Sequence, residues 1–226
     1  ADGRLLLALT INDGVRLHRV ADGALLGEDR EFGRQPAYTA ALSRDGLALV
    51  GSRDGALRLY RVGPDGLERL VKRAAHSRGS PHAAAFSPDG RKVAVTHLFG
   101  GNNIAVLDAG TLDLLYNADT RGFRHGFVSV DWSADGSTLY AGASAFGEGA
   151  RSVRSYSAEG RGAFRTIEVS QHNIEDLKVL PQGGFVAVAR DAAIAAFDGG
   201  DRPLYRVRPR FPNYIFRPDA LRVARG

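Results

Sequence analysis

A turn motif that recurs at nearly equal intervals is the feature that most constrains the fold of this chain. Four segments share an apolar residue, a polar turn and a glycine, and they cover residues 41–46, 85–90, 131–136 and 179–184. Residues 215–220 form a degenerate fifth copy, and residues 1–3 match the end of a sixth. The turn glycine or its substitute falls at 3, 46, 90, 136, 183 and 220, so the intervals are 43, 44, 46, 47 and 37 residues. Such a period indicates an array of equivalent structural units.

Each interval contains short segments of strand character, and no segment has a sustained helical period. An apolar strand is expected after each turn, at 5–9, 47–50, 92–96, 138–141 and 185–189. A strand of alternating character follows, at 15–20, 56–62, 104–108, 152–156 and 193–197. A small turn rich in Gly and Asp and a last, more variable strand complete the unit. Each repeat is therefore predicted to supply about four short strands.

Four-stranded units with a period of 43–47 residues are the signature of a β-propeller, in which each unit is one blade. We therefore predict an all-β fold and a single propeller array over residues 1–226. About five blades are visible, with repeats at 4–46, 47–90, 91–136, 137–183 and 184–220. The chain has no Met and ends in a redundant tail, which favours a piece of a larger ring, possibly seven-bladed. The alternative is a closed five-bladed ring in which residues 214–218 pair with the first blade.

One position of the turn motif is predicted to fill the contacts between blades. It holds an apolar side chain in every copy, and the residues are Leu42, Phe86, Trp132, Leu180 and Phe216. Because aromatic side chains dominate burial of this kind, Trp132 is expected to be a core residue and not a ligand-binding one.

Two segments resemble WD40-type repeats: residues 86–95, which read Phe-Ser-Pro-Asp-Gly-Arg-Lys-Val-Ala-Val, and residues 53–60. The turn Asp of that family is matched by Asp13, Asp54 and Asp191. The family's Trp position instead holds His18, Tyr60, Leu107, Tyr156 and Phe197, so its hydrogen-bond network is incomplete here. Residues 102–112 are more similar to the related bacterial YVTN-type repeats.

The resemblance implies a rigid, non-enzymatic platform for protein partners. Bacterial members of the WD40 type are often fused to effector domains, so the chain is expected to be a scaffold or sensor part of a larger protein. The partner and the oligomeric state are left open.

Composition removes several classes of function. The chain has no Cys, which excludes disulfides, thiolate metal sites and a Cys nucleophile. The formal net charge is +5, an excess compatible with acidic partners but too small to demand them. No stretch approaches the roughly 18 apolar residues that span a bilayer, so no membrane insertion is expected. No signal segment opens the chain, which slightly favours a cytoplasmic location, although the natural N-terminus is expected to be missing.

Histidines supply the main candidate for a metal or ligand site. His76, His125 and His172 lie near the start of successive first strands and could surround one mouth of the ring. Their offsets from the turn glycine differ, and no carboxylate accompanies them at a fixed spacing, so we predict no metal and no cofactor. The acids Glu175 and Asp176 are predicted to be solvated.

The loops between second and third strands and the loops between blades are expected to share one face, which is the predicted partner-binding face. Its candidate residues combine Arg and aromatic side chains, as binding hot spots do: Phe99, Asn102, Phe146, Arg151, Arg124, Arg53, Arg190 and Tyr214. In the alternative, Phe99 and Phe146 fold back on their own loops.

Two rival functions remain. The first is a ligand-binding or hydrolytic propeller of the lactonase type, with a site at the central mouth. The second is nucleic-acid binding through the Arg-rich region after residue 201, where Tyr205, Phe211 and Tyr214 interleave with arginines. Because the outer strand of a blade is normally charged and solvated, we do not expect nucleic acid as the partner.

Overall fold

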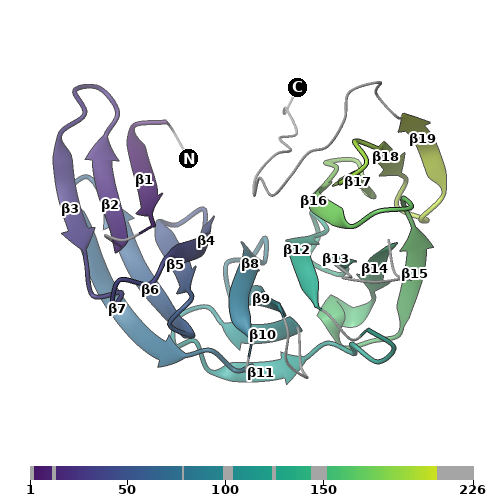
Figure 1. Cartoon of the computed structure of the whole chain (residues 1–226), viewed down its shortest axis with the longest axis horizontal. Coiled ribbons are helices and arrows are strands. Elements are labelled where there is room, and N and C mark those ends of the chain that lie inside the picture. Colours follow the sequence, from purple (N-terminus) through teal and green to yellow (C-terminus); the bar gives the residue numbers. More distant parts are fainter. Residues whose placement is uncertain are drawn as a thin grey trace.

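The chain folds into antiparallel β-sheets that follow one another around an arc (Figure 1). The computed structural model describes residues 3–11, 14–77, 79–98, 104–123, 126–143 and 152–207. In these ranges there are nineteen strands in five sheets, and the one helical segment is a single 3₁₀ turn, η1 (Ala158–Gly160). The all-β propeller-type fold predicted from the repeat is therefore confirmed. None of the described segments is a helix long and apolar enough to cross a membrane.

The strands of each sheet are ordered as they occur along the chain, so every strand pairs with its neighbour in sequence. The first sheet has three strands within the described residues: β1 (Leu5–Thr10), β2 (Gly14–Arg19) and β3 (Leu25–Asp29). The second sheet contains β4 (Ala37–Leu42), β5 (Leu47–Ser52), β6 (Ala56–Gly63) and β7 (Gly66–Ala74). The third contains β8 (Ser80–Phe86), β9 (Lys92–Leu98), β10 (Ile104–Asp108) and β11 (Leu114–Asn117).

The last two sheets have the same arrangement. The fourth contains β12 (Phe127–Trp132), β13 (Leu139–Ala143), β14 (Ser152–Tyr156) and β15 (Phe164–Glu168). The fifth contains β16 (Ile174–Val179), β17 (Phe185–Ala189), β18 (Ile194–Phe197) and β19 (Pro203–Val207). In Figure 1, β4, β8, β12 and β16 lie on the concave side of the arc, and β7, β11, β15 and β19 lie on its outside.

The sequence repeat and the sheet are out of phase by one strand. The predicted repeat 47–90, for example, runs through β5, β6 and β7 and then includes β8, which is the first strand of the next sheet. The turn that closes this repeat is held by its own side chains. In the turn after β8, Ser87 Oγ donates to Asp89 Oδ1 at 2.6 Å and accepts from the amide of Lys92 at 2.9 Å. Gly90 has φ +71°, a conformation that explains the glycine of the motif.

Facing sheets bury apolar side chains between them, as stacked propeller blades must. Trp132 is only 4% exposed, and its Nε1 donates to the carbonyl of Ala85 at 3.0 Å, across the contact between the third and fourth sheets. The prediction of a core role for Trp132 is confirmed. It is wrong for Leu42, which is 54% exposed.

The fourth copy of the motif, at residues 179–184, is displaced by one residue from the sequence alignment. Val179 pairs with Phe185 as Trp132 pairs with Leu139, so Val179 occupies the apolar position that was assigned to Leu180. Val179 packs against the core between the fourth and fifth sheets. Leu180 instead takes the place of the turn serine. The amide of Leu180 donates to the carbonyl of Gly184, just as the amide of Ser87 donates to the carbonyl of Lys92. Phe216 lies outside the described residues.

A buried arginine joins the second sheet to the first. The side chain of Arg58 on β6 is fully buried, and its guanidinium lies 4.0 Å from the ring centroid of Phe32. Its Nη2 donates to Asp54 Oδ2 and to the carbonyl of Glu31, both at 2.6 Å. Tyr60, two residues on, donates its hydroxyl to Asp29 Oδ2 at 2.8 Å. The arginine thus binds the segment that leaves β3, and the tyrosine binds the last residue of β3.

The fourth sheet repeats this joint with a different set of partners. Arg154 on β14 is 3% exposed, and its guanidinium lies between Phe123 and Phe164, at 4.2 Å and 3.9 Å from the two ring centroids. It donates to the carbonyls of Asp119, at 2.8 Å, and Arg121. The hydroxyl of Tyr156 also donates to the carbonyl of Asp119, at 2.9 Å. Arg154 and Tyr156 therefore bind the segment that leaves β11.

Candidate functional site

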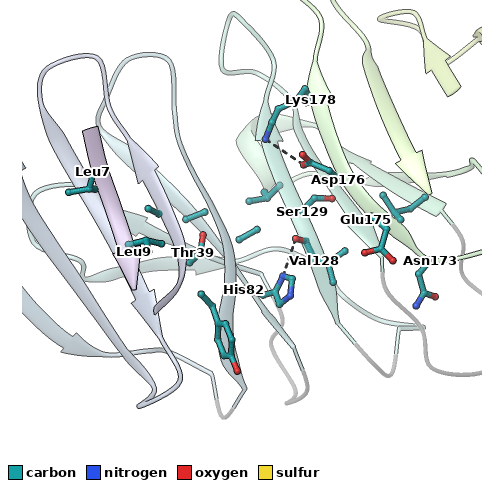
Figure 2. A pocket seen from close by; sticks show the side chains of 16 residues that line it. Leu7, Leu9, Thr39, His82, Val128, Ser129, Asn173, Glu175, Asp176 and Lys178 are labelled. Atoms are coloured by element: carbon teal, nitrogen blue, oxygen red, sulfur yellow. Dashed lines mark hydrogen bonds and ion pairs between the residues drawn. The ribbon is translucent and has the colours of Figure 1, made fainter. Parts of the chain in front are cut away.

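The strands on the concave side of the arc surround a cavity of about 270 Å³ (Figure 2). We call it the central cavity. One part of its wall is apolar and includes Leu7 and Leu9 of β1 together with Ala40 and Ala84. The opposite part, from β16 and the residue before it, carries polar and charged side chains: Asn173, Glu175, Asp176 and Lys178.

The central cavity is shaped by a β-bulge at the same place in each of β4, β8, β12 and β16. In each strand, pairing with the neighbour skips one residue: between Ala37 and Thr39, Pro81 and Ala83, Phe127 and Ser129, and Ile174 and Asp176. The residues left over are Tyr38, His82, Val128 and Glu175, and all four line the cavity. Bulges redirect side chains and are frequent beside functional sites. Four equivalent positions on the inner strands thus carry four different groups: a phenol, an imidazole, an isopropyl group and a carboxyl group.

His82 contributes a neutral imidazole to this ring. Its Nδ1 lies 3.2 Å from the carbonyl oxygen of Val128 on the next strand (Figure 2). Because a carbonyl can only accept, Nδ1 carries the proton and Nε2 is left as an acceptor. Burial lowers the pKa of His82 below its usual value, with the hydrogen bond to Val128 acting in the opposite direction. The side chain is therefore uncharged near neutral pH.

Glu175 contributes a partly desolvated carboxyl group. Burial raises the pKa of Glu175, while the positive charge of Arg190 opposes that rise. Its neighbour Asp176 is 4% exposed, accepts from the amide of Leu177 at 2.8 Å, and lies 3.5 Å from Lys178 Nζ. The expectation that Glu175 and Asp176 are solvated acids is wrong. Glu175 is the residue left over at the bulge of β16, and both Glu175 and Asp176 line the central cavity.

A second charged group lies further along β12. Asp131 accepts from the amide of Val179 at 2.9 Å, which ties β12 to β16. Burial raises the pKa of Asp131, and the amide of Val179 and the charge of Lys178 work against the rise. Lys178 thus lies near both Asp131 and Asp176. At this end a wider mouth of about 960 Å³ opens between the Asp-Gly turns, with Phe86 and Trp132 in its wall.

Of the histidines singled out in the sequence, the two that the structure describes do not line the central cavity. His76 Nε2 bonds the carbonyl of Leu112 at 3.1 Å, and His172 is exposed between β15 and β16. His125 lies outside the described residues. No group of three or more His, Cys, Asp or Glu side chains in the described ranges is arranged to hold a metal ion.

Of the eight residues predicted to form the partner-binding face, two lie in the part of the chain that the structure describes. Arg53 and Arg190 hold equivalent turn positions, after β5 and β17, and their amides donate to the carbonyls of Pro36 and Asn173. Both turns therefore lie beside segments that connect sheets. Arg53 is exposed and Arg190 is half-buried. The other six residues lie outside the described ranges: Phe99, Asn102, Phe146, Arg151, Arg124 and Tyr214.

We call this side of the molecule the loop face. Its described part comprises the segments between sheets, at 30–36, 75–77, 118–123 and 169–173, and the turns at 53–55 and 190–193. The backbone carbonyls bound by Arg58 and Arg154 belong to two of these segments. The sequence could not reveal the bulges. The repeats align on their turns, and this alignment does not show that one residue of the preceding strand is left out of the pairing.

Comparison with solved structures supports the fold and nothing finer. No protein-family model and no curated protein matches the sequence. A computationally designed protein, Ika8, is similar with a TM-score of 0.75 and 18% identity over 94% of this chain and 61% of its own. A chain of the mitotic checkpoint complex is similar with a TM-score of 0.75 and 15% identity over 94% of this chain and 65% of its own. This chain thus spans less than two thirds of the length of either neighbour.

Proposed function

We propose that this chain is a non-enzymatic, WD40-like propeller module that binds a protein partner through the loop face. The observation that carries the proposal is the pair of equivalent arginines, Arg53 and Arg190, set on turns beside the connecting segments. Arginine is one of the residues that contribute most to the energy of protein interfaces. The resemblance of the fold to a chain of a protein complex agrees with such a role.

Rigid presentation of the loop face supports the proposal further. Binding costs less conformational entropy when the contacting segments are already held in place. The segment after β3 is bound by Arg58, and Tyr60 binds Asp29, the last residue of β3. The segment after β11 is bound by Arg154 and Tyr156. Side chains of the following sheet thus hold two connecting segments of the loop face in place through hydrogen bonds to their backbone carbonyls.

A pair of double variants tests the proposal. Arg53→Ala/Arg190→Ala removes the loop-face arginines, and Arg44→Ala/Arg91→Ala removes two exposed arginines from the turns at the other ends of the strands. A partner captured by the wild-type chain is identified by mass spectrometry, purified, and titrated against both variants. We expect the loop-face variant to lose at least about tenfold in affinity and the control to lose less than threefold. Equal effects, or a larger effect of the control, contradict the proposal.

A second candidate function is ligand binding in the central cavity. The four bulges favour it, because each diverts a side chain into the same space at a cost in regular pairing. At about 270 Å³ the cavity lies at the lower end of the range for small-molecule sites, about 300–1,000 Å³. It has room for one small molecule or one inserted side chain.

A further inference from the structure

The balance of charge around the central cavity favours a positively charged ligand. Of the residues that line the cavity, Glu175 and Asp176 are acidic and Lys178 is basic. Arg190, which is not part of the lining, lies close enough to Glu175 for its charge to act on that carboxyl group. His82 adds no charge, because burial keeps it neutral near pH 7. The described lining thus has one more acidic than basic side chain, which is an excess of one negative charge when both acids are ionised. A cation entering the cavity would find that charge in a poorly solvated site, where attraction is stronger than in water.

The two walls of the cavity favour a cation with an aliphatic body. Leu7 and Leu9 offer methyl and methylene surface, and Glu175 and Asn173 lie across the cavity from them (Figure 2). Ala40 and Ala84 add further apolar lining. The Nε2 of His82 is an acceptor, since the carbonyl of Val128 holds the proton on Nδ1. An ammonium group has three donors and no acceptor, which suits a carboxylate and an imidazole nitrogen together.

We propose that the central cavity binds an alkylammonium group, with the nitrogen between the bulged residues Glu175 and His82 and the alkyl chain against Leu7 and Leu9. The group can belong to a free aliphatic amine or to a lysine side chain of a partner. This proposal rests on the second candidate function, ligand binding in the cavity. Its test uses none of the loop-face variants, although Arg190 lies close enough to Glu175 for its charge to lower the pKa of that residue.

Calorimetric titration of the full chain tests the proposal. The probes are n-butylammonium chloride and the peptide acetyl-Gly-Lys-Gly-amide. The comparison compounds are n-butanol, sodium butyrate and the same peptide with norleucine in place of lysine. We expect at least one of the two ammonium probes to bind and the comparison compounds to bind at least tenfold more weakly. Binding of the free amine alone identifies a small metabolite, and binding of the peptide alone identifies a partner lysine.

Three variants show whether the binding occurs where it is proposed. Glu175→Gln keeps the shape of the side chain and removes its charge, and Glu168→Gln makes the same change on exposed β15. We expect Glu175→Gln to weaken ammonium binding at least tenfold and Glu168→Gln to leave it unchanged. Ala84→Leu, which fills part of the cavity, should abolish binding. Melting curves of each variant show that the fold is intact.

The outcomes separate failure of this proposal from failure of the cavity as a site. If butyrate or butanol binds and Ala84→Leu abolishes that binding, the cavity is a ligand site and the ammonium proposal is wrong. If Glu175→Gln and Glu168→Gln behave alike, the proposal is also wrong. If no probe binds to the folded wild-type chain at millimolar concentration, the ammonium proposal is overturned and the loop-face proposal is unaffected.

Discussion

Contacts between neighbouring sheets are of two kinds, and they alternate along the chain. The contacts of the first with the second sheet and of the third with the fourth contain a buried arginine, Arg58 or Arg154. In the contacts of the second with the third sheet and of the fourth with the fifth, the equivalent residue is Ala105 or Ala195. The equivalence follows from pairing, since Arg58, Ala105, Arg154 and Ala195 all face the middle of the preceding strand.

The alternation separates two tasks that a propeller must combine. The alanine contacts are filled by apolar side chains such as Leu49, Leu59, Val93 and Leu107. In the described residues, their connecting segments are held by side-chain hydrogen bonds from His76 to the carbonyl of Leu112 and from Ser170 to Asp191, and not by a buried guanidinium. In the arginine contacts a polar guanidinium replaces part of the buried apolar surface, and this guanidinium binds backbone carbonyls of the connecting segments. We infer that the alanine contacts chiefly stabilise the stack of sheets and the arginine contacts chiefly position the loop face.

Converting one kind of contact into the other should have the largest effect. Ala105→Arg places a guanidinium among the apolar side chains that pack around Ala105 in the described part of this contact. We expect a loss of at least about 4 kcal/mol in the free energy of unfolding, or failure to fold. Ala105→Met is the control for size and should cost about 1–3 kcal/mol. Denaturant unfolding measures both, and an Arg variant as stable as the Met variant would show that the two contacts are interchangeable.

The two arginine contacts should themselves differ when the charge is removed. Arg58→Met leaves Asp54 without its ion-pair partner, and we expect a loss of about 3 kcal/mol. Arg154→Met removes a guanidinium that binds carbonyls and two aromatic rings, and we expect a loss of about 1–2 kcal/mol. Unfolding of the two variants under identical conditions gives the comparison. An equal or larger loss in Arg154→Met would contradict it.

Acid should distinguish the same two contacts. Burial of Asp54 opposes its ionisation, but hydrogen bonds from Arg58 and Ser52 outweigh burial and lower its pKa from 3.8 to about 2. A carboxyl group with a lowered folded pKa stabilises the fold above its unfolded pKa, and that contribution disappears as the pH falls from about 4 to about 2. The full contribution is about 2 kcal/mol. Stability measured against pH should therefore lose this component in Asp54→Asn.

The control for acid is Arg154 in the fourth sheet, whose hydrogen bonds go to the backbone carbonyls of Asp119 and Arg121. The pKa of the Asp119 carboxyl group is lowered chiefly by its hydrogen bond with Arg121, and the charge of Arg154 contributes least. The effect of Arg154→Met on stability should therefore change less between pH 7 and pH 3 than that of Arg58→Met. A pH-independent difference between wild type and Asp54→Asn would show that the Asp54 carboxylate does not stabilise the contact.

The tyrosines should show the smallest effect. Tyr156→Phe removes one hydrogen bond to the carbonyl of Asp119, for which we expect a loss of about 1 kcal/mol. As a control, Arg61→Ala breaks an exposed ion pair with Glu68 and should cost less than about 0.5 kcal/mol. Thermal unfolding of the two variants ranks them. A larger loss for Arg61→Ala would mean that burial of the hydroxyl does not decide the cost.

The sequence predicted the strands well because turn chemistry and apolar alternation are local properties. Residues 104–108, 152–156 and 185–189 were predicted as strands with the bounds that β10, β14 and β17 have. Local patterns could not predict the bulges, because a skipped pairing depends on the neighbouring strand. For that reason Glu175 and Asp176 were expected in solvent, and the displaced motif around Val179 was aligned one residue late.

The arginines were missed for a related reason. In sequence Arg58 and Arg154 look like the many other arginines of strands that face solvent. Only the approach of the preceding sheet buries them, and the residues that receive them, Phe32 and Phe123, lie in connecting segments with no repeat signature. The residue pattern of one strand does not show which side chains of the neighbouring sheet pack against that strand.

Amide hydrogen exchange tests most directly whether the buried arginines hold the loop face in place. Exchange is measured for wild type, Arg154→Met and Arg58→Met, at a pH where all three are folded. We expect Arg154→Met to accelerate exchange in residues 118–123, Arg58→Met to accelerate it in residues 30–35, and neither to affect residues 75–77, which no such arginine binds. Unchanged protection of 118–123 in Arg154→Met, or an equal acceleration in all three segments, would contradict the positioning role of these arginines.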